Sequence, residues 1–512
     1  MSDEDQSQQA VFAFLADPAT HGGAKVTRID THAASVFLAG DRVLKVKRAV
    51  RFPFLDYSTL EKRKAACEAE LSVNAPYAPE IYHGVVPIAR DANGKFTIGG
   101  AGVPAEWAVD MQRFDETRTL DHLAGEIDEA LADALGRAVA AAHAKTLVAD
   151  AENWIAALGG YVDEHVEVFG QYPDVFPAVE IDALARASRE AYQRIVPLLR
   201  ERGQRGFVRH IHGDLHLGNI ALIGGKPVLF DAIEFSDIIA TGDVLYDLAF
   251  LLMDLLERGL AFVADVVLNR YLTQTQRIEH LEALSTLPFF LSMRASIRAT
   301  VITARLERAK VSDRDSISRS ARAYFNFARQ AIAPPAPKFV AVGGLSGTGK
   351  TKLARALAPE LKPMPGAVIV RSDVERKALF GIDEAEKLPT DGYTDEVTAR
   401  VYSTVIDKAR RVLAAGHSVI VDAVFAQAEE RADIADAAES ANFTLRGLFL
   451  TADLQTRLNR VGTRAHDASD ADAEVAQAQE RDDLGVLDWT EIDASGTPEN
   501  TLARAKAALA SA

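Results

Sequence analysis

At 512 residues the chain exceeds one ordinary folding unit, and a prior of ~150 residues per domain gives about three domains. Its 73 acidic and 57 basic side chains leave a formal net charge of −16, which repels nucleic acid and anionic membranes over long range. The single cysteine, Cys67, excludes an internal disulfide and favours a reducing cytoplasm. The apolar runs are far shorter than the ~20 residues that span a bilayer, and the acidic N-terminus does not resemble a signal peptide.

The first two thirds of the chain predict two lobes. Short strand-like runs and turns dominate residues 1–120, with one helix expected over 58–73. Residues 121–332 are rich in alanine and leucine at helical spacing, except for short strands between 205 and 236. A small β-rich lobe followed by a larger helical lobe is the arrangement of a bilobal, kinase-like α+β fold.

A proline cluster, APPAP at 333–337, predicts an extended linker, because proline fixes φ and disfavours helix in the preceding residue. Behind it, strand-like and helical runs alternate through residues 338–512, beginning with FVAVG before a glycine-rich turn. This alternation predicts an α/β domain with a parallel sheet flanked by helices. We place the main domain boundary at the linker.

The stretch HIHGDLHLGN, residues 210–219, contains the first candidate site. Phosphoryl transfer from ATP needs a carboxylate beside the acceptor hydroxyl, groups that hold Mg²⁺ and a lysine on the phosphates. Asp214 and Asn219 lie five residues apart, as in the catalytic loop of kinase-like enzymes. Asp231 ends a strand-like run downstream and is the expected further Mg²⁺ ligand, with Glu234 one turn on. An isolated HGD would indicate only a capped turn, but this combination favours a catalytic site.

Upstream, Lys45 in RVLKVK is the candidate lysine for the ATP phosphates, although Lys47 competes with it. The helix over 58–73 offers Glu70 as its ion-pair partner, with Glu68 as the alternative. The segment THAAS, which ends at Ser35, replaces a glycine-rich loop as the candidate phosphate contact.

HGDLHLGN followed by FDAIEF resembles the aminoglycoside phosphotransferase family, with its relatives acting on choline, homoserine and other small alcohols. The resemblance implies that Asp214 is the catalytic base, that Asn219 and Asp231 bind Mg²⁺, and that His212 braces the loop. Asp247, in a helix typical of this family, is expected to be a structural hydrogen bonder. DAI in place of DFG and the missing glycine-rich loop argue against a protein kinase.

The segment GLSGTGKT, residues 344–351, matches G-x-x-x-x-G-K-[ST] between a predicted strand and a predicted helix. Glycines let backbone N–H groups face the phosphates, Lys350 reaches the β and γ oxygens, and Thr351 binds Mg²⁺. The expected nucleotide-binding residues are Gly344, Ser346, Gly347, Thr348, Gly349, Lys350 and Thr351.

Three arginines downstream, Arg457, Arg460 and Arg464, have the spacing of one helix face. Arginines on a lid can neutralise the transferring phosphoryl group and exclude water, so Arg460 and Arg464 are candidate catalytic residues. A solvated helix face is the alternative.

Residues 338–512 resemble the P-loop kinase group that contains gluconate kinase, zeta-type toxins and polynucleotide 5′-kinase. Asp373 and Arg376 match the Asp-x-x-Arg of the latter two. The resemblance implies that Asp373 accepts the proton of the acceptor hydroxyl, that Arg376 orients the acceptor, and that Asp422 lies near Mg²⁺. Asp373 could alternatively cap the following helix.

The preferred hypothesis is a bifunctional ATP-dependent phosphotransferase, with Mg²⁺ as cofactor and small-molecule hydroxyl compounds as acceptors. Nucleic acid is not expected as a partner, because residues 338–512 carry 21 basic and 28 acidic side chains. One alternative gives catalysis to one region and nucleotide sensing to the other. Another is a toxin-like or polynucleotide-kinase-like P-loop domain regulated by the first domain. The surface composition fits a monomer and a homodimer equally.

Overall fold

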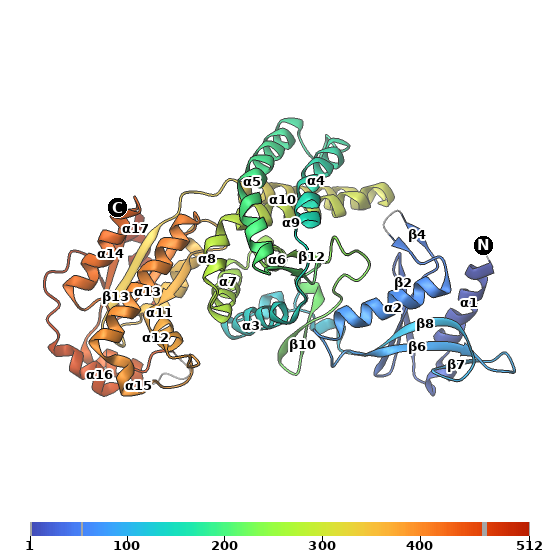
Figure 1. Cartoon of the computed structure of the whole chain (residues 1–512), viewed down its shortest axis with the longest axis horizontal. Coiled ribbons are helices and arrows are strands. Elements are labelled where there is room, and N and C mark those ends of the chain that lie inside the picture. Colours follow the sequence, from blue (N-terminus) through green and yellow to red (C-terminus); the bar gives the residue numbers. More distant parts are fainter. Residues whose placement is uncertain (1–2, 53–54, 463–467, 511–512) are drawn as a thin grey trace. The chain divides into compact units, whose positions relative to one another are not determined.

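The structure is a computed structural model that describes residues 3–52, 55–462 and 468–510 (Figure 1). The chain packs as two compact units. The first comprises Met1–Glu164 and Val196–Asp254, and the second comprises His165–Ile195 and Leu255–Ala512. The helices α4 (Glu152–Gly170), α5 (Ala178–Gln204) and α6 (Val244–Glu257) contain residues of both.

The first unit contains an antiparallel sheet of six strands in the order β1-β2-β3-β8-β6-β7. Its strands are β1 (Val26–Asp30), β2 (Ala34–Ala39), β3 (Arg42–Lys47), β6 (Tyr82–Arg90), β7 (Phe96–Ile98) and β8 (Val103–Gln112).

Helices α1 (Asp3–Ala16) and α2 (Leu60–Asn74) pack against this sheet. Neighbouring side chains of β3 point to opposite faces, so Val43 packs with Cys67 of α2 while Leu44 packs in the cluster that includes Phe12 of α1. The Thr59 side chain caps α2 by accepting a hydrogen bond from Lys62 N–H, one residue beyond the predicted start of this helix.

One further helix and six short strands complete the regular structure described for the first unit. They are α3 (Glu129–Lys145) and the short strands β4 (Arg51–Phe52), β5 (Leu55–Asp56), β9 (Val208–His210), β10 (Ile220–Ile223), β11 (Lys226–Leu229) and β12 (Thr241–Asp243). The strands pair as three two-stranded ribbons, β4 with β5, β9 with β12 and β10 with β11.

The second unit begins with a helical part. Phe169, Phe176 and Phe325 form an aromatic cluster there, with ring centroids 4.6 to 5.1 Å apart. Its helices are α7 (Ala261–Thr275), α8 (Ile278–Glu282), α9 (Leu287–Thr303) and α10 (Val311–Ile332).

The second unit also contains a parallel sheet in the order β14-β15-β13-β16-β17. Its strands are β13 (Phe339–Gly344), β14 (Val368–Arg371), β15 (Val419–Asp422), β16 (Leu445–Thr451) and β17 (Thr490–Asp493). Its helices are α11 (Lys350–Leu357), α12 (Ser372–Leu379), α13 (Asp395–Ala414), α14 (Ala428–Ser440), α15 (Leu454–Gly462), α16 (Ala473–Ala478) and α17 (Pro498–Ala510).

The central strand β13 is buried along its whole length, as expected for a parallel strand covered on both faces. Val340 and Val342 of this strand pack with Leu353 of α11 and Ile492 of β17 in one hydrophobic core. The predicted fold class is confirmed, namely a kinase-like region with a curled antiparallel sheet followed by a parallel P-loop sheet with flanking helices.

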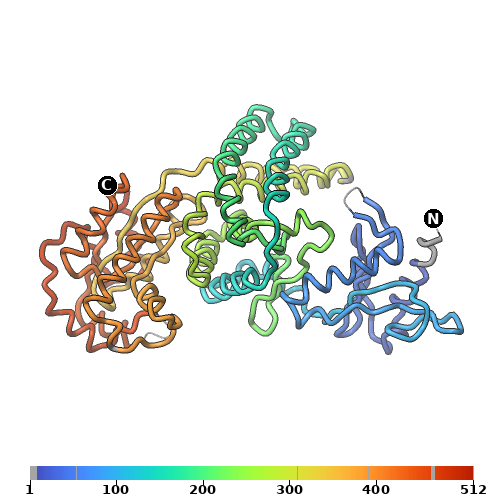
Figure 2. The backbone as a smooth tube through the Cα atoms, in the orientation of Figure 1, coloured from blue at the N-terminus to red at the C-terminus, as the bar shows by residue number. Residues whose placement is uncertain are grey.

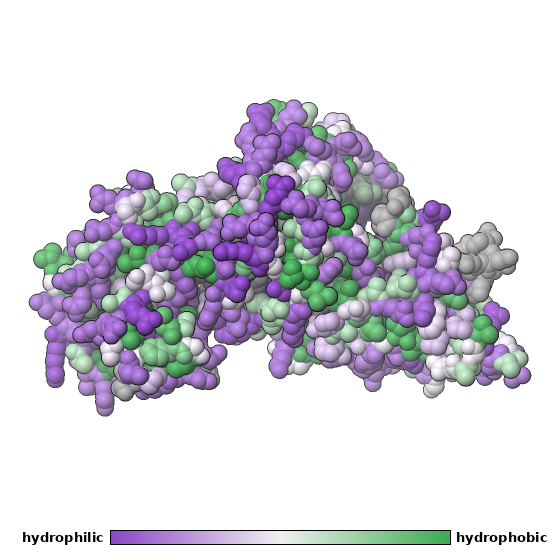
Figure 3. Space-filling model, viewed as in Figure 1, coloured by the Kyte–Doolittle hydropathy of each residue, from purple (hydrophilic) through white to green (hydrophobic). Residues whose placement is uncertain are grey.

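Residues 333–337 form an extended segment between α10 and β13, as Figure 2 shows, and both of its flanks lie in the second unit. Hydrophilic residues dominate the face of the molecule seen in Figure 3, with hydrophobic residues in scattered groups. None of the helices in the described ranges combines the length and the apolar character needed to cross a membrane.

A buried carboxyl group lies within the second unit. Asp265 of α7 is almost fully buried, and its Oδ1 atom has no hydrogen-bond partner among the residues that the structure describes. A Cβ atom at Gly366 would lie 2.2 Å from this oxygen, so only glycine fits there. Burial raises the pKa of Asp265 well above its usual range, although a hydrogen bond from Asn269 opposes the shift.

This raised pKa predicts a pH effect with a definite sign. The folded chain binds the Asp265 proton more tightly than the unfolded chain does. The free energy of unfolding therefore falls as pH rises from the pKa of Asp265 in the unfolded chain towards its higher pKa in the folded chain. The fall is about 1.4 kcal/mol per pH unit at most. Asp265→Asn resembles the protonated carboxyl and removes this loss. The Tm of the variant minus that of the unmodified chain should therefore become more positive between pH 5 and pH 8. Asp436→Asn, on an exposed position of α14, is the control. If the Tm difference from the unmodified chain is independent of pH for both variants, the prediction is wrong.

Candidate active sites

The first candidate site is built on the loop between β9 and β10. Asn219 ends a 3-10 turn (Leu217–Asn219), and its Nδ2 donates to Asp214 Oδ2 at 3.0 Å and to Asp214 O at 2.9 Å. The Asp214 side chain is 38% exposed, whereas Asn219 is buried. The structure thus brings the two predicted residues together, with the carboxylate accessible to a small molecule.

Buried side chains fix this loop from behind. Asp247 of α6 accepts hydrogen bonds from the backbone N–H groups of His212 (2.9 Å) and Gly213 (3.0 Å), in agreement with the structural role expected for it. The His212 ring donates from Nε2 to Phe230 O at 3.0 Å, and burial lowers its pKa, so the ring is neutral. Asp254 accepts from Leu217 N–H at 3.0 Å. The backbone of the loop is therefore held independently of any bound molecule.

His216 also lies at this site, although no function was predicted for it. Its Nδ1 accepts a hydrogen bond from Gly218 N–H at 3.0 Å, and its Nε2 lies 3.4 Å from Asp214 Oδ2. Because a backbone N–H can only donate, the hydrogen of the neutral ring is on Nε2, which faces the carboxylate. The ring also packs edge-on against Phe250, with centroids 5.7 Å apart. His216 and Asn219 thus face the same oxygen of the Asp214 carboxylate.

The predicted lysine and its partner meet across the sheet and α2. Lys45 Nζ lies 2.7 Å from Glu70 Oε1 and 2.8 Å from Asp231 Oδ1. Asp231 has a φ of 60°, in the left-handed region that aspartate adopts more readily than most other residue types. The alternative partner, Glu68, pairs instead with Lys64 on the surface.

Glu70 also binds the competing lysine. Lys47 Nζ lies 2.6 Å from Glu70 Oε2 and forms a second ion pair with Glu234. Burial alone would raise the pKa of Glu70, but the adjacent Lys45 and Lys47 lower it to about 2. Burial alone would lower the pKa of each lysine, yet the carboxylates raise it above its usual value. All of these groups are therefore charged at neutral pH, and Lys45 and Lys47 share one buried carboxylate.

The contact predicted for Ser35 is not supported. Ser35 is fully buried on β2, and its hydroxyl donates to Asp30 Oδ1 at 2.6 Å. A side chain without exposed surface cannot reach a phosphate oxygen, and its hydroxyl braces the turn before β2 instead.

The second candidate site begins at the carboxyl end of β13. Three glycines of the loop, Gly344, Gly347 and Gly349, have φ values of 136°, 89° and 96°, which other residues rarely adopt. The Thr348 hydroxyl donates to Leu345 O at 2.8 Å, and Ser346 N–H donates to a side-chain oxygen of Gln479 at 2.8 Å. The loop therefore has a tight, glycine-dependent path before a helix, and three of its backbone N–H groups, those of Gly344, Ser346 and Thr348, donate within the protein.

The first residues of α11 contact the ends of the neighbouring strands. Lys350 Nζ donates to Gly344 O at 2.7 Å, and the Thr351 hydroxyl donates to Asp422 Oδ2 at 2.7 Å. Asp422 ends β15, and Arg371, which ends the paired strand β14, lies 3.5 Å from the same oxygen and 3.4 Å from Thr351 Oγ1. Arg371 was missed, although its place at a strand end two residues before Asp373 was a usable signal.

Both sites offer donors that fit Mg²⁺, which prefers oxygen ligands and keeps several waters and phosphate oxygens. Asn219 and Asp231 supply an amide and a carboxylate oxygen in the first site, and Thr351 and Asp422 supply a hydroxyl and a carboxylate in the second. Across the described part of the chain, no group of three or more His, Cys, Asp or Glu residues could hold a metal by itself. A small number of protein ligands is typical of sites in which Mg²⁺ also binds phosphate oxygens.

Helix α12 carries the predicted Asp-x-x-Arg pair. Asp373 lies half-buried in its first turn, and the N-cap position belongs to Arg371, so Asp373 does not cap the helix. Arg376 is buried, donates to Gly392 O (2.9 Å) and Thr398 Oγ1 (3.1 Å), and lies over the Tyr393 ring. Its guanidinium thus holds the segment before α13, while the proposed role towards the acceptor stays a prediction.

The arginine face predicted for a lid is divided in the structure. Arg457 is fully buried and donates to Ser346 O and Ala476 O, both at 2.9 Å, so it braces the phosphate loop rather than covering it. Arg460 donates to Thr348 O at 3.2 Å and Ala494 O at 2.8 Å. Arg464 lies outside the described residues. Regular spacing did not indicate that Arg457 points into the protein.

The charge of Glu70 generates a stability prediction. Glu70→Gln leaves Lys45 and Lys47 with one buried carboxylate fewer, and breaking a buried ion pair from one side costs about 3–5 kcal/mol. We expect a large fall in the Tm of the variant at pH 7. As pH falls from about 4.5 to about 2, Glu70 itself becomes protonated, so the difference should shrink.

The matched control is Glu68→Gln on the same helix. Its surface ion pair with Lys64 is worth at most about 0.5 kcal/mol. Equal Tm values for the two variants would show that the buried network does not stabilise the fold.

The geometry of His216 generates a kinetic prediction. His216→Phe keeps a ring beside Phe250 but removes the donor that faces Asp214, and we expect Asp214-dependent ATP turnover to lose about tenfold in kcat with little change in KM. His216→Asn keeps the acceptor for Gly218 N–H, which phenylalanine lacks, so it should retain more activity than His216→Phe. A phenylalanine variant as active as the unmodified chain would rule out this positioning role.

Comparisons with known proteins agree with both resemblances. Residues 43–283 match the sequence model of the phosphotransferase enzyme family, and residues 339–482 match that of an AAA domain. Uncharacterized proteins of Mycobacterium tuberculosis and Mycobacterium bovis are 28% identical over 491 residues, which cover 93% of this chain and 94% of theirs.

Three solved structures are similar to parts of the chain. A gluconokinase from Sinorhizobium meliloti is 20% identical, with 34% of this chain and 93% of that chain covered and a TM-score of 0.26. A choline/ethanolamine kinase family protein from Mesorhizobium loti is 15% identical, with 64% and 99% covered and a TM-score of 0.35. Wild-type aminoglycoside 2′-phosphotransferase-IIIa is 15% identical, with 62% and 98% covered and a TM-score of 0.37. Two sequence models thus match separate parts of the chain, the phosphotransferase enzyme family in residues 43–283 and an AAA domain in residues 339–482.

Proposed function

We propose that the chain is a bifunctional ATP-dependent phosphotransferase in which each region transfers the γ-phosphoryl group of ATP to a hydroxyl of a small molecule. The proposal is supported by the presence, in each region, of residues suited to bind phosphate, to hold a metal ion and to accept a proton. In the first region these are Lys45, Asn219 with Asp231, and Asp214. In the second they are the loop 344–351, Thr351 with Asp422, and Asp373.

In the first site the accessible Asp214 carboxylate accepts the proton of the acceptor hydroxyl as the new O–P bond forms and the bond between the β- and γ-phosphates breaks, releasing ADP. Asn219 and His216 hold the carboxylate in one orientation before the acceptor arrives. Lys45, kept charged by Glu70, binds the phosphates. Asn219 and Asp231 would hold Mg²⁺, which neutralises phosphate charge when bound.

In the second site the backbone amides of residues 344–351 and Lys350 bind the phosphates, and Asp373 accepts the acceptor proton. Arg371 contacts both Thr351 and Asp422, so it orients the two groups that would hold Mg²⁺. Arg460, bonded to Thr348 O, stands at the loop as the described candidate for neutralising transferred charge.

Small hydroxyl compounds are the proposed acceptors in both sites. The net charge of −16 opposes association with a polyanion, and no groove of interleaved basic and aromatic residues was predicted. The buried and single Cys67 supports a reducing, cytoplasmic location in this proposal.

Two single substitutions test whether the sites act separately. Asp214→Asn should lower the rate of phosphoryl transfer in the first site by about 10²–10⁴-fold and leave transfer in the second site unchanged. Lys350→Met should have the opposite effect, with a loss of similar size in the second site only. The assay is transfer from radiolabelled ATP into a pool of small hydroxyl compounds, with products separated for each variant.

Matched controls are Asp237→Asn, an exposed aspartate near the first site, and Lys352→Met, an exposed lysine two residues after Lys350. Both should behave like the unmodified chain. Loss of all products through either single substitution would exclude independent sites. Loss through only one of them would assign catalysis to that region and nucleotide sensing to the other.

A further inference from the structure

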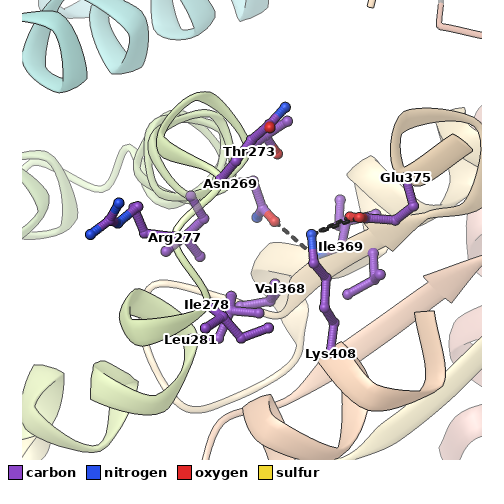
Figure 4. Close-up of a pocket in the computed structure, with 12 residues that line it drawn as sticks. Asn269, Thr273, Arg277, Ile278, Leu281, Val368, Ile369, Glu375 and Lys408 are labelled. Carbon is purple, nitrogen blue, oxygen red and sulfur yellow. Dashed lines mark hydrogen bonds and ion pairs between the residues drawn. The ribbon is translucent and has the colours of Figure 1, made fainter. Parts of the chain in front are cut away.

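The outer edge of the parallel sheet is completed by a side chain. β14 pairs with β15 on one side, and no strand of the described residues pairs with its other side. Asn269 of α7 meets this edge. Its Oδ1 accepts from Ile369 N–H at 2.7 Å (Figure 4). Its Nδ2 donates to Ala367 O at 3.1 Å. One amide group thus makes the two hydrogen bonds that a neighbouring strand would make.

The assignment of the Asn269 oxygen and nitrogen follows from its partners. A backbone N–H can only donate and a carbonyl can only accept, so the amide has one orientation that satisfies both. The same Nδ2 also donates to Asp265 O at 3.0 Å and Asp265 Oδ2 at 3.2 Å. Asn269 and Asp265 are at least partly buried, so loss of the amide would leave Ile369 N–H and Ala367 O without the protein partner that they have here.

Further contacts fasten α7 and α8 to the P-loop region. Arg270 of α7 forms an ion pair with Glu384 at 2.7 Å, and Glu282 of α8 forms one with Arg411 of α13. Beside Asn269 lies a cavity of about 40 Å³, with room for one or a few water molecules. Apolar side chains from both sides line it, namely Leu272, Leu281, Val368 and Val370.

The edge that Asn269 contacts leads directly into the second candidate site. Arg371 is both the last residue of β14 and the N-cap of α12, and its guanidinium lies beside Thr351 and Asp422. Asp373 follows in the first turn of α12. Any shift of β14 along or away from the sheet would therefore move Arg371 and Asp373 relative to the phosphate loop.

We propose that Asn269 is a positioning residue of the P-loop site, holding β14 so that Arg371 and Asp373 stay aligned with Thr351 and Asp422. The P-loop kinase is then incomplete when cut at the linker, because part of its sheet edge is supplied by α7, upstream of residues 333–337. The link to catalysis rests on the proposed function, whereas the link to the order of β14 does not.

Hydrogen exchange on the full-length chain tests the structural half of the proposal. Asn269→Ala should speed amide exchange in the segment 368–376 about tenfold, because the Ile369 amide loses its acceptor and α12 its fixed start. Thr273→Ala, one turn later on α7 and lining the same cavity, is the control and should leave this segment unchanged. Unchanged exchange in Asn269→Ala would overturn the proposal.

Steady-state kinetics on the same full-length variants test the catalytic half. In an Asp214→Asn background, Asn269→Ala should lower the kcat of Lys350-dependent turnover about tenfold and change the KM for ATP less than about twofold, since the phosphate loop keeps its contacts. Asn269→Asp keeps the acceptor for Ile369 N–H but sets a carboxylate oxygen against Ala367 O and Asp265 Oδ2, so it should not restore the lost kcat. Equal kcat values for Asn269→Ala and Thr273→Ala would overturn the positioning role.

The two readouts separate the possible failures. If Lys350→Met removes no turnover, the proposed function of the P-loop region fails, and the exchange experiment alone decides the role of Asn269. If turnover depends on Lys350 but exchange in 368–376 is insensitive to Asn269, the proposed function stands and the role given to Asn269 is wrong.

Discussion

Charges held out of water by a partner of opposite charge are the constraint on which both candidate sites depend. Glu70 is fully buried and would be too costly as a lone carboxylate, but Lys45 and Lys47 keep it ionised. In return it keeps both lysines in place and charged on the face of β3 that meets α2. In the second unit the buried Asp422 lies 3.5 Å from the Arg371 guanidinium and accepts a hydrogen bond from the Thr351 hydroxyl. Phosphate-binding groups are thus ordered before a nucleotide is bound, which lowers the reorganisation needed for catalysis.

Local patterns predicted the parts of the sites that are local in the chain. Asp214 and Asn219 share one loop, and the glycine-rich segment 344–351 fixes its own backbone path, so spacing alone was sufficient. Lys45 and Glu70 followed from the alternation of a strand and the position of one helix. The other contacts of the site depend on tertiary packing. The ion pair between Lys47 and Glu234, for example, joins residues far apart in sequence, and no periodicity indicates it.

Burial direction was the main source of error. The spacing of Arg457 and Arg460 predicted a common helix face, but tertiary packing turned Arg457 inward against the phosphate loop. Ser35 was predicted from its place before a strand, yet the pleat buries its side chain. Asn269 carried no signal at all, because an asparagine in an amphipathic helix usually faces water, and only the three-dimensional contact with β14 gives it a role.

The central claim is that one chain binds two nucleotides by different means, with a lysine and carboxylate-held metal in one region and backbone amides in the other. Isothermal titration with a non-hydrolysable ATP analogue and Mg²⁺ measures this most directly on the full-length chain. The account predicts two equivalents bound by the unmodified chain, one by Lys45→Met, one by Lys350→Met and none by the double variant. A single equivalent bound by the unmodified chain and lost in only one of the two variants would contradict it.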